Sequence, residues 1–249
     1  MSCSSHEFFC CVPAAHAATI AVTAVKGNGD LSNESQQPVQ PATVVLVHGL
    51  WMSGFELRVL KHRLEAGGQF RAVAFSYPSL TGTMNDHVRA LLDFAQAQDV
   101  PELHFVGHSL GGLVILRALQ LTDDLPPGRA VLLGTPLQGS RAAQGVARIL
   151  PFGKAILGAA VNTECVEFAP REWRGHRDVG VIAGSMGLGL GRLFADLNAD
   201  HDGTVLVEET LLPGAKDHIT LSTSHTGMLF SAEVAEQAGW FLRTGEFRR

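Results

Sequence analysis

Short, nearly unbroken runs of hydrophobic residues alternate along this chain with longer stretches that are apolar on one side only. The runs are typical of strands buried on both faces, as in a parallel sheet covered by helices, and the one-sided stretches are typical of those helices. The chain therefore predicts an α/β fold with a mostly parallel central sheet and helices on both faces. The expected strands are residues 43–47, 72–77, 103–106, 129–133, 179–183 and 217–221.

The expected helices lie at residues 54–66, 84–98, 113–121 and 228–243. Residues 137–178 interrupt the alternation and contain two short helical stretches, 140–150 and 154–161, which Pro151 separates. Because this insertion directly follows a strand, we expect it over the carboxyl ends of the strands, where open α/β sheets bind ligands. It is predicted to be a small helical cap, and an ordinary surface excursion is the alternative.

Length and composition predict one compact domain at residues 41–249. A chain of 249 residues with 46% hydrophobic and 17% charged residues can bury a large core and is unlike a disordered segment. The net charge is −5, and the 19 Lys and Arg residues are scattered. A clustered basic surface for phosphates is therefore absent from the sequence, which argues against nucleic acid as a partner.

Residues 1–40 are expected to form an N-terminal tail. They contain an apolar stretch at 8–25 and end in a polar linker. A signal peptide would carry Lys or Arg ahead of its apolar region, but only His6 and Glu7 stand there, although the triplet at 15–17 imitates a cleavage site. This balance favours a cytoplasmic protein over an exported one. Pro13 and the polar interruptions argue against an integral membrane span, which needs about 20 consecutive apolar residues.

The cysteines predict no metal site. Three of the four lie in the tail, and Cys165 stands alone far downstream. None forms a C-x-x-C pair or has a histidine at ligand spacing, so we expect no zinc site. No motif in the chain points to a cofactor.

Residues 107–112 read Gly-His-Ser-Leu-Gly-Gly and connect an expected strand to an expected helix. A G-x-S-x-G sequence in this context holds Ser109 exposed on a sharp turn, as a nucleophile. Gly107 and Gly111 are expected because a Cβ at either place would collide with its neighbours. The helix that begins at Leu110 directs its free N–H groups to the side of the serine. The alternative is that Ser109 only caps the helix.

A serine nucleophile needs a base that accepts its proton and an acid that orients the base. His225 follows the last expected strand and precedes the final helix, so it lies in a loop that can reach Ser109. Other histidines are placed less well, because they lie in a strand, in the motifs themselves or before the last strand: His218, His108, His48 and His201. We therefore expect His225 to be the base.

The acid is expected in the loop after the strand at 179–183. Asp200 and Asp202 are two residues apart and cannot point the same way in an extended segment. Asp202 is preferred because it forms a tight Asp-Gly turn with Gly203, which can project the carboxylate from the loop. Asp200 stays open as an alternative, and Asp196 follows it.

The same loop also resembles half of a calcium loop. Asp200-x-Asp202-Gly matches its middle, and Glu209 stands six residues beyond the glycine, where a bidentate glutamate is expected. The first aspartate of such a loop is replaced by Asn198, which argues against calcium.

The strand at 43–47 runs into His48-Gly49-Leu50-Trp51. Such a turn exposes the N–H of the residue after the glycine, so Leu50 N–H and Leu110 N–H are the expected oxyanion donors. A plain strand-ending turn is the alternative. Because the insertion carries more apolar side chains than two short helices can bury, we expect an apolar substrate pocket. Its predicted wall consists of Trp51, Met52, Leu137, Phe152 and Leu157.

Together these segments resemble the α/β-hydrolase superfamily, and within it the small bacterial lipases and esterases of the class 2 lipase type. The matching pieces span most of the chain: His48-Gly49-Leu50, residues 107–112, Gly-Thr-Pro-Leu-Gln-Gly-Ser at 134–140, Asp202-Gly203-Thr204-Val205 and residues 224–229. The family usually carries a histidine after the proline of the third piece, whereas this chain has Leu137. The resemblance implies a serine hydrolase that cleaves small-molecule or lipid carboxylic esters through an acyl-enzyme, with Ser109, Asp202 and His225 as the catalytic triad.

Other functions share parts of this pattern. An acyltransferase or thioesterase uses the same triad and differs only in the acceptor or the bond cleaved. A haloalkane dehalogenase or epoxide hydrolase needs an aspartate at the position of Ser109 and is excluded. A non-catalytic binding protein of the same fold would be expected to lack a triad residue, and none is missing here.

Overall fold

This computed structural model describes residues 40–167, 170–189 and 199–249. The expectations for the N-terminal tail concern residues 1–39 and lie outside the described residues, as do Asp196 and Asn198. The described chain folds around a six-stranded sheet in the order β2-β1-β3-β4-β5-β6, in which all neighbouring strands are parallel. The predicted α/β fold is confirmed.

The strands lie where hydrophobic runs predict them, but pairing decides where they end. Their bounds are Ala42–Val47 (β1), Phe70–Phe75 (β2), Leu103–His108 (β3), Ala130–Leu133 (β4), Val179–Gly184 (β5) and Asp217–Leu221 (β6). β2 begins two residues before the predicted strand because Phe70 pairs with the first residue of β1. β3 continues through His108 because its last residues pair with Leu132 and Leu133 of β4.

In the described part of the chain, four helices cover the sheet: Arg58–Glu65 (α1), Met84–Gln96 (α2), Leu110–Leu121 (α3) and Ala232–Thr244 (α6). α2 begins with a capping box in which Thr83 and Asp86 bond each other's backbone amides. The single helix predicted at 228–243 is instead a 3₁₀ helix, Gly227–Phe230, followed by α6. The two are separate because Ser231 is extended and its hydroxyl caps α6 by accepting from Val234 N.

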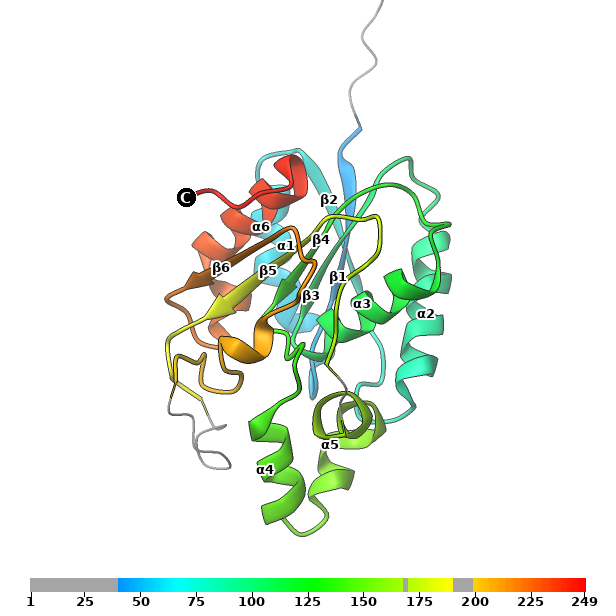
Figure 1. The fold of residues 1–249 in the computed structure, drawn as a ribbon. Helices are drawn as coiled ribbons and strands as arrows, with labels where there is room; N and C mark the ends of the chain where they lie inside the picture. The colour runs from blue at the N-terminus through cyan, green and yellow to red at the C-terminus, as the bar shows by residue number, and fades with distance from the viewer. Residues whose placement is uncertain (1–39, 168–169, 190–198) are drawn as a thin grey trace, which may run out of the picture. The chain divides into compact units, whose positions relative to one another are not determined.

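Alternate residues of each strand pack into two different cores. On one face, Val45 and Phe105 pack with α2 and α3, and on the other face Val44 and Val106 pack with α1 and α6. Figure 1 shows the sheet between these two helical layers. Burial on both faces explains why the strands read as continuous hydrophobic runs. None of the helices within the described ranges is both long and apolar enough to cross a bilayer.

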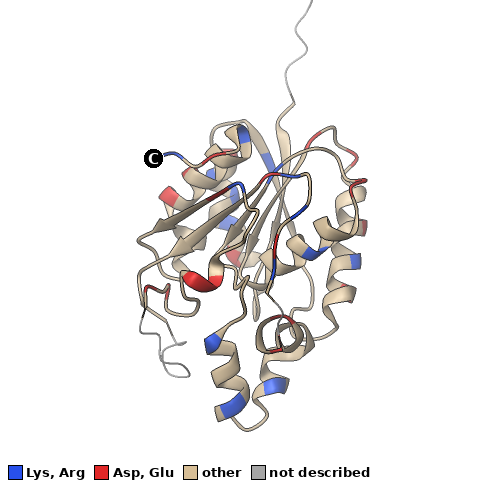
Figure 2. Cartoon of the chain, in the orientation of Figure 1, with Lys and Arg blue, Asp and Glu red and all other residues tan. Residues whose placement is uncertain are grey.

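The segment between β4 and β5 carries two further helices, Arg141–Ile149 (α4) and Gly153–Val161 (α5), and a π-helical turn, Asn162–Val166. Figure 1 shows α4 and α5 beyond the carboxyl ends of the strands. Both helices carry Lys or Arg but neither contains Asp or Glu (Figure 2). α5 is kinked at Gly158, where a Cβ would lie 2.7 Å from Leu80 O, so glycine lets the cap approach the loop after β2.

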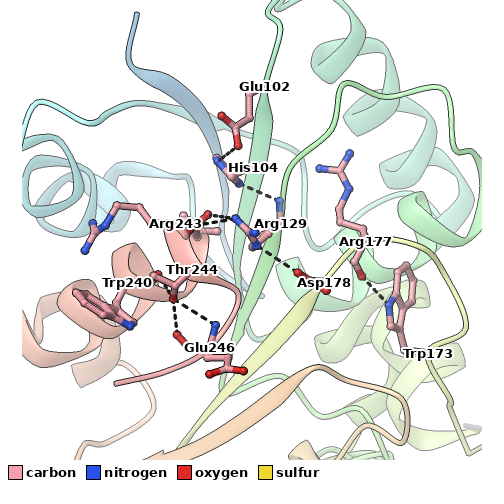
Figure 3. Close-up of polar contacts among 11 residues, drawn as sticks. Glu102, His104, Arg129, Trp173, Arg177, Asp178, Trp240, Arg243, Thr244 and Glu246 are labelled. Carbon is pink, nitrogen blue, oxygen red and sulfur yellow. Dashed lines mark hydrogen bonds and ion pairs between the residues drawn. The ribbon is translucent and has the colours of Figure 1, made fainter. Parts of the chain in front are cut away.

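A polar network ties the chain together at the amino ends of the strands (Figure 3). Arg129, just before β4, donates from Nη1 to Leu242 O and Arg243 O at 2.9 and 3.1 Å and pairs with Asp178 at 3.2 Å. Its amide donates to His104 Nδ1. Burial lowers the pKa of His104 to about 4, and the nearby arginines act in the same direction. Arg129 therefore joins the end of α6 to the sheet, and the histidine that accepts from its amide is neutral.

Candidate active site

Ser109 lies on a strained turn between β3 and α3. Its backbone has φ 54° and ψ −121°, which non-glycine residues rarely adopt, and its amide donates a 2.9 Å hydrogen bond to Leu133 O. The side chain is partly exposed and makes no capping hydrogen bond to α3. The alternative role of Ser109 as a capping side chain is therefore wrong.

The predicted role of the glycines beside Ser109 is confirmed. A Cβ on Gly107 would lie 2.7 Å from the backbone of Gly112, and a Cβ on Gly111 would lie 2.3 Å from Val47 O. Neither distance is possible without moving backbone. A side chain at either position would push α3 away from the strands and displace Ser109.

His225 and Asp202 come from separate loops and form a close pair. The Nδ1 to Oδ2 distance is 2.7 Å, and His225 N donates to Asp202 O at 2.8 Å. Asp202 Oδ1 accepts from the amides of Thr204 and Val205 at 2.9 and 2.7 Å. With Asp202 ionised, the imidazole proton is held on Nδ1, and Nε2 keeps a free lone pair. Asp200 is exposed, and its side chain takes no part in this pair.

Opposing effects set the charge of Asp202. Its burial favours the neutral carboxyl, but the pairing with His225 and the amides of Val205 and Thr204 outweigh burial and hold the pKa of Asp202 below its usual value of 3.8. The carboxylate is therefore ionised at neutral pH.

His108 supports the loop of His225, a role that sequence reasoning missed. Its Nε2 donates to His225 O at 2.9 Å, and the two rings lie 4.7 Å apart. Burial lowers the pKa of His108 to about 3, so this histidine is neutral and is a support rather than a second base. Gly134 was named only as part of the 134–140 motif, without a role; a Cβ there would lie 3.0 Å from Asp202 Oδ2. The sequence could have indicated both His108 and Gly134, because each stands at the carboxyl end of a buried strand, where site residues gather.

The turn after β1 lies against Ser109. A Cβ on Gly49 would be 3.1 Å from Ser109 Cβ, so a side chain there would crowd Ser109, and glycine favours this close approach. Leu50 and Leu110 line the same cavity as Ser109, and neither amide donates a hydrogen bond to another described residue. His48 stabilises this turn, because its Nδ1 donates to Gly49 O at 2.9 Å.

Trp51 connects this turn to the cap. Its backbone is left-handed, with φ 59°, and its amide donates to Ser79 Oγ at 3.2 Å. The indole Nε1 donates to Ile156 O of α5, also at 3.2 Å. Trp51 therefore closes one side of the space between the turn and the cap.

A cavity of about 330 Å³ opens beside Ser109, and none of the described residues that line it is charged. Its wall comes from the turn after β1, the cap helices and the loop of Asp202. The lining residues are Leu50, Trp51, Ser109, Leu110, Pro136, Ser140, Ala142, Ala143, Val146, Leu150, Ile156, Leu157, Val161, Cys165, Thr204 and Val205. Burial raises the pKa of the Cys165 thiol to about 12, so this lining residue stays a neutral thiol.

Comparison with known proteins identifies the family. A sequence model described as "Alpha/beta hydrolase family" matches residues 44–244. The chain belongs to the α/β-hydrolase family. A search of curated proteins gives no match for this α/β-hydrolase.

Solved structures share the fold at low sequence identity. The mature lipase BlEst2 of Bacillus licheniformis is 20% identical, with a TM-score of 0.60 over 79% of this chain and 89% of its own. The carboxylesterase CesB (YbfK) of Bacillus subtilis is 16% identical, with a TM-score of 0.52 over 84% and 85%. The RedJ thioesterase from the prodiginine pathway of Streptomyces coelicolor is 14% identical, with a TM-score of 0.54 over 81% and 86%. The predicted resemblance to α/β-hydrolases is thus confirmed.

Three residues predicted at the pocket wall lie elsewhere in this α/β-hydrolase. Met52 packs against the core between the sheet and helices α1 and α6. Leu137 is fully buried in the other core, and Phe152 is 85% exposed at the turn between α4 and α5. Trp51 and Leu157 do line the cavity. Sequence could not separate the two groups, because all five are large and apolar. Their placement depends on the turn after β1, on the loop before α4 and on the orientation of α5.

The calcium alternative does not fit the observed carboxylates. Both oxygens of Glu209 accept from backbone amides, and Asp202 is engaged by His225 and by two amides. Across the described ranges, no three His, Cys, Asp or Glu side chains are grouped so as to hold a metal ion.

Proposed function

We propose that this α/β-hydrolase cleaves carboxylic esters through an acyl-enzyme formed on Ser109. Two observations carry the proposal. The 2.7 Å pair of His225 and Asp202 leaves imidazole Nε2 free, and the strained, partly exposed Ser109 directly follows His108, whose ring packs 4.7 Å from the ring of His225. Close backbone packing holds Ser109 in this strained conformation. Such strain lowers stability and is typical of active sites, where it positions a reactive group. His225 is the base, and Asp202 orients it.

The reaction follows from this arrangement. Ser109 Oγ bonds to the ester carbonyl carbon while its proton passes to His225 Nε2. The oxyanion is stabilised by the N–H groups of Leu50 and Leu110. The carbon–oxygen bond to the alcohol then breaks, and the alcohol takes the proton from His225. Water attacks the acyl-enzyme with its proton going to Nε2. The bond to Ser109 Oγ then breaks as Oγ takes this proton from Nε2, which releases the acid and restores the serine hydroxyl and the neutral imidazole.

The cavity supports an apolar acyl group as the part of the substrate next to Ser109. A charged group would lose its hydration there without gaining a partner from the described lining, in which every side chain is uncharged. An acyl chain would instead bury its methylenes against Val146, Leu150 and Leu157. Small-molecule or lipid esters with a neutral acyl chain are therefore the proposed substrates.

Hydrolysis of p-nitrophenyl butyrate by wild type and by the Ser109→Ala variant tests the proposal. Wild type should turn over the ester, and Ser109→Ala should lower kcat by about 10³-fold or more while its circular dichroism spectrum stays unchanged. An equal rate in the two proteins would remove Ser109 from the mechanism. Repeating the assay with butyryl thioester, and with added alcohol as acceptor, separates an esterase from a thioesterase and from an acyltransferase.

A further inference from the structure

Glu209 is a buried carboxylate that the proposed reaction does not use. It lies in the 3₁₀ helix Glu208–Thr210, and only 5% of the residue is exposed. Its two oxygens accept hydrogen bonds from backbone amides in two distant parts of the chain. Oε1 accepts from Arg141 N at 2.6 Å, and Oε2 accepts from Leu206 N at 2.9 Å.

One of these amides belongs to the loop that carries Asp202. Leu206 forms an isolated β-bridge with His201, and Val205 both accepts from Asp202 N at 3.1 Å and donates to Asp202 Oδ1. Glu209 N also donates to Leu206 O at 3.0 Å. Glu209 therefore fixes the last residue of the loop whose carboxylate pairs with His225.

The other amide belongs to the cap. Arg141 is the first residue of α4, so its N–H has no partner within the helix, and a carboxylate there also suits the positive end of the helix. α4 supplies Ala142, Ala143 and Val146 to the cavity wall. The main chain adds a second link, since Gln138 N donates to Glu209 O at 2.9 Å.

Among the residues that the structure describes, no cation forms an ion pair with the Glu209 carboxylate. The Arg141 guanidinium turns instead to the exposed Glu208, at 2.7 Å, and Figure 2 shows this acidic turn beside the start of α4. Burial raises the pKa of Glu209 above its usual value, although the amides of Arg141 and Leu206 act against it. A buried, unpaired carboxylate opposes folding, so packing alone does not account for a glutamate here.

We propose that Glu209 is a positioning residue that holds the Asp202 loop and the α4 wall of the cavity in one geometry. The inference rests on the proposed function, since it assigns Asp202 and the cavity to ester cleavage. Two consequences separate it from a purely structural role. Loss of the Leu206 link should lower kcat, and loss of the Arg141 link should weaken the preference for longer acyl chains.

The first test compares Glu209→Gln with Glu208→Gln, its neighbour in the same helix. Glutamine has the same size but replaces one oxygen by an NH₂ group, which faces an amide donor. For p-nitrophenyl butyrate, Glu209→Gln should lower kcat by about 10-fold or more, since small displacements of catalytic groups have effects of this size. Glu208→Gln should stay within about 2-fold of wild type, because its partner is exposed.

The second test leaves Glu209 in place and removes only the amide that it accepts from. Arg141→Pro deletes the N–H at the first helical position, where proline is well tolerated, and Ser140 is already extended, with φ −143° and ψ 113°, as a residue before proline should be. Arg141→Ala is the matched control, because it loses the same side chain but keeps the amide. Arg141→Pro should reduce the ratio of kcat/KM for octanoate to that for acetate by about 3-fold or more, and Arg141→Ala should leave it unchanged.

The outcomes distinguish the two proposals. If wild type shows no ester turnover, the proposed function fails, and this inference fails with it. If wild type is active but Glu209→Gln matches Glu208→Gln, or Arg141→Pro matches Arg141→Ala, the positioning role alone is overturned. If Glu209→Gln does not fold, the Arg141 pair still decides the role of the cap link.

Discussion

At Asp202 the pairing with His225 determines both charge and pH response. Burial alone would raise the pKa of this carboxyl, but the pairing and two amides hold it below the unfolded-state value of 3.8. A group of this kind adds stability that is present above the unfolded pKa and is lost as the pH falls through the folded-state pKa. As the pH is lowered from 5 to 3, the urea midpoint of wild type should therefore decrease relative to that of Asp202→Asn. A difference that grows over this interval would mean that the folded carboxyl prefers its proton.

Asp202 should also matter more for catalysis than its neighbour. An amide at this position favours the wrong imidazole tautomer, and the corresponding change in a serine protease costs about 10⁴-fold in kcat. We expect a loss of that order for Asp202→Asn with p-nitrophenyl butyrate. Asp200→Asn is the control and should keep most of the activity, because Asp200 is exposed. Small and equal losses would assign the role to another carboxylate.

At the scale of elements, the cap should set acyl-chain preference. Each buried methylene contributes about 0.8 kcal/mol, or about 4-fold in kcat/KM, as far as the wall extends. We expect kcat/KM to rise from acetate to butyrate, and Leu157→Ala to flatten this rise because Leu157 lines the cavity. Phe152→Ala is a control from the same cap, since Phe152 points to solvent. A steady decline from acetate onward would refute the apolar acyl site and leave the fold unaffected.

The polar network around Arg129, at the amino ends of the strands, should affect stability and not turnover. Arg129 joins β4 to the end of α6 through two carbonyls, whereas its pair with the partly exposed Asp178 adds little. Arg129→Met should therefore lower the free energy of unfolding by about 1–3 kcal/mol. Urea unfolding measures this loss, and kcat should remain within about 2-fold of wild type. Unchanged stability would show that the contacts of Arg129 are not needed to hold α6.

Sequence reasoning predicts elements well where one physical cause dominates. Burial on both faces makes the strands continuous hydrophobic runs, so the sequence predicts all six described strands. Only their ends differ from the prediction, because the pairing between strands decides them, as at Phe70. Ser231 gave a local capping signal that the apolar periodicity on either side concealed. At the site, chain order and loop position indicated Ser109, Asp202 and His225. The solvent exposure of Phe152 and the hydrogen bond from His108 to His225 O cannot be predicted from hydrophobic periodicity, because both depend on contacts between distant segments.

For the whole molecule, residues 40–249 form one compact unit in which β1 begins at Ala42. Deletion of residues 1–38 should therefore leave a folded and active protein, because every described strand and site residue lies beyond the cut. Melting temperature and kcat of the truncated and full chains measure this. Loss of soluble protein on truncation would show that the apolar residues 19–25 contribute to the sheet.

The identity of Ser109 as the nucleophile is tested most directly by covalent labelling. Folded wild type and Ser109→Ala are treated with a fluorophosphonate probe, and the modified peptide is located by mass spectrometry. The partly exposed Ser109 and the proposed base His225, oriented by Asp202, predict a single adduct, on the peptide that contains Ser109, and no adduct in Ser109→Ala. A folded wild type that stays unlabelled, or an adduct that persists in Ser109→Ala, would contradict the account.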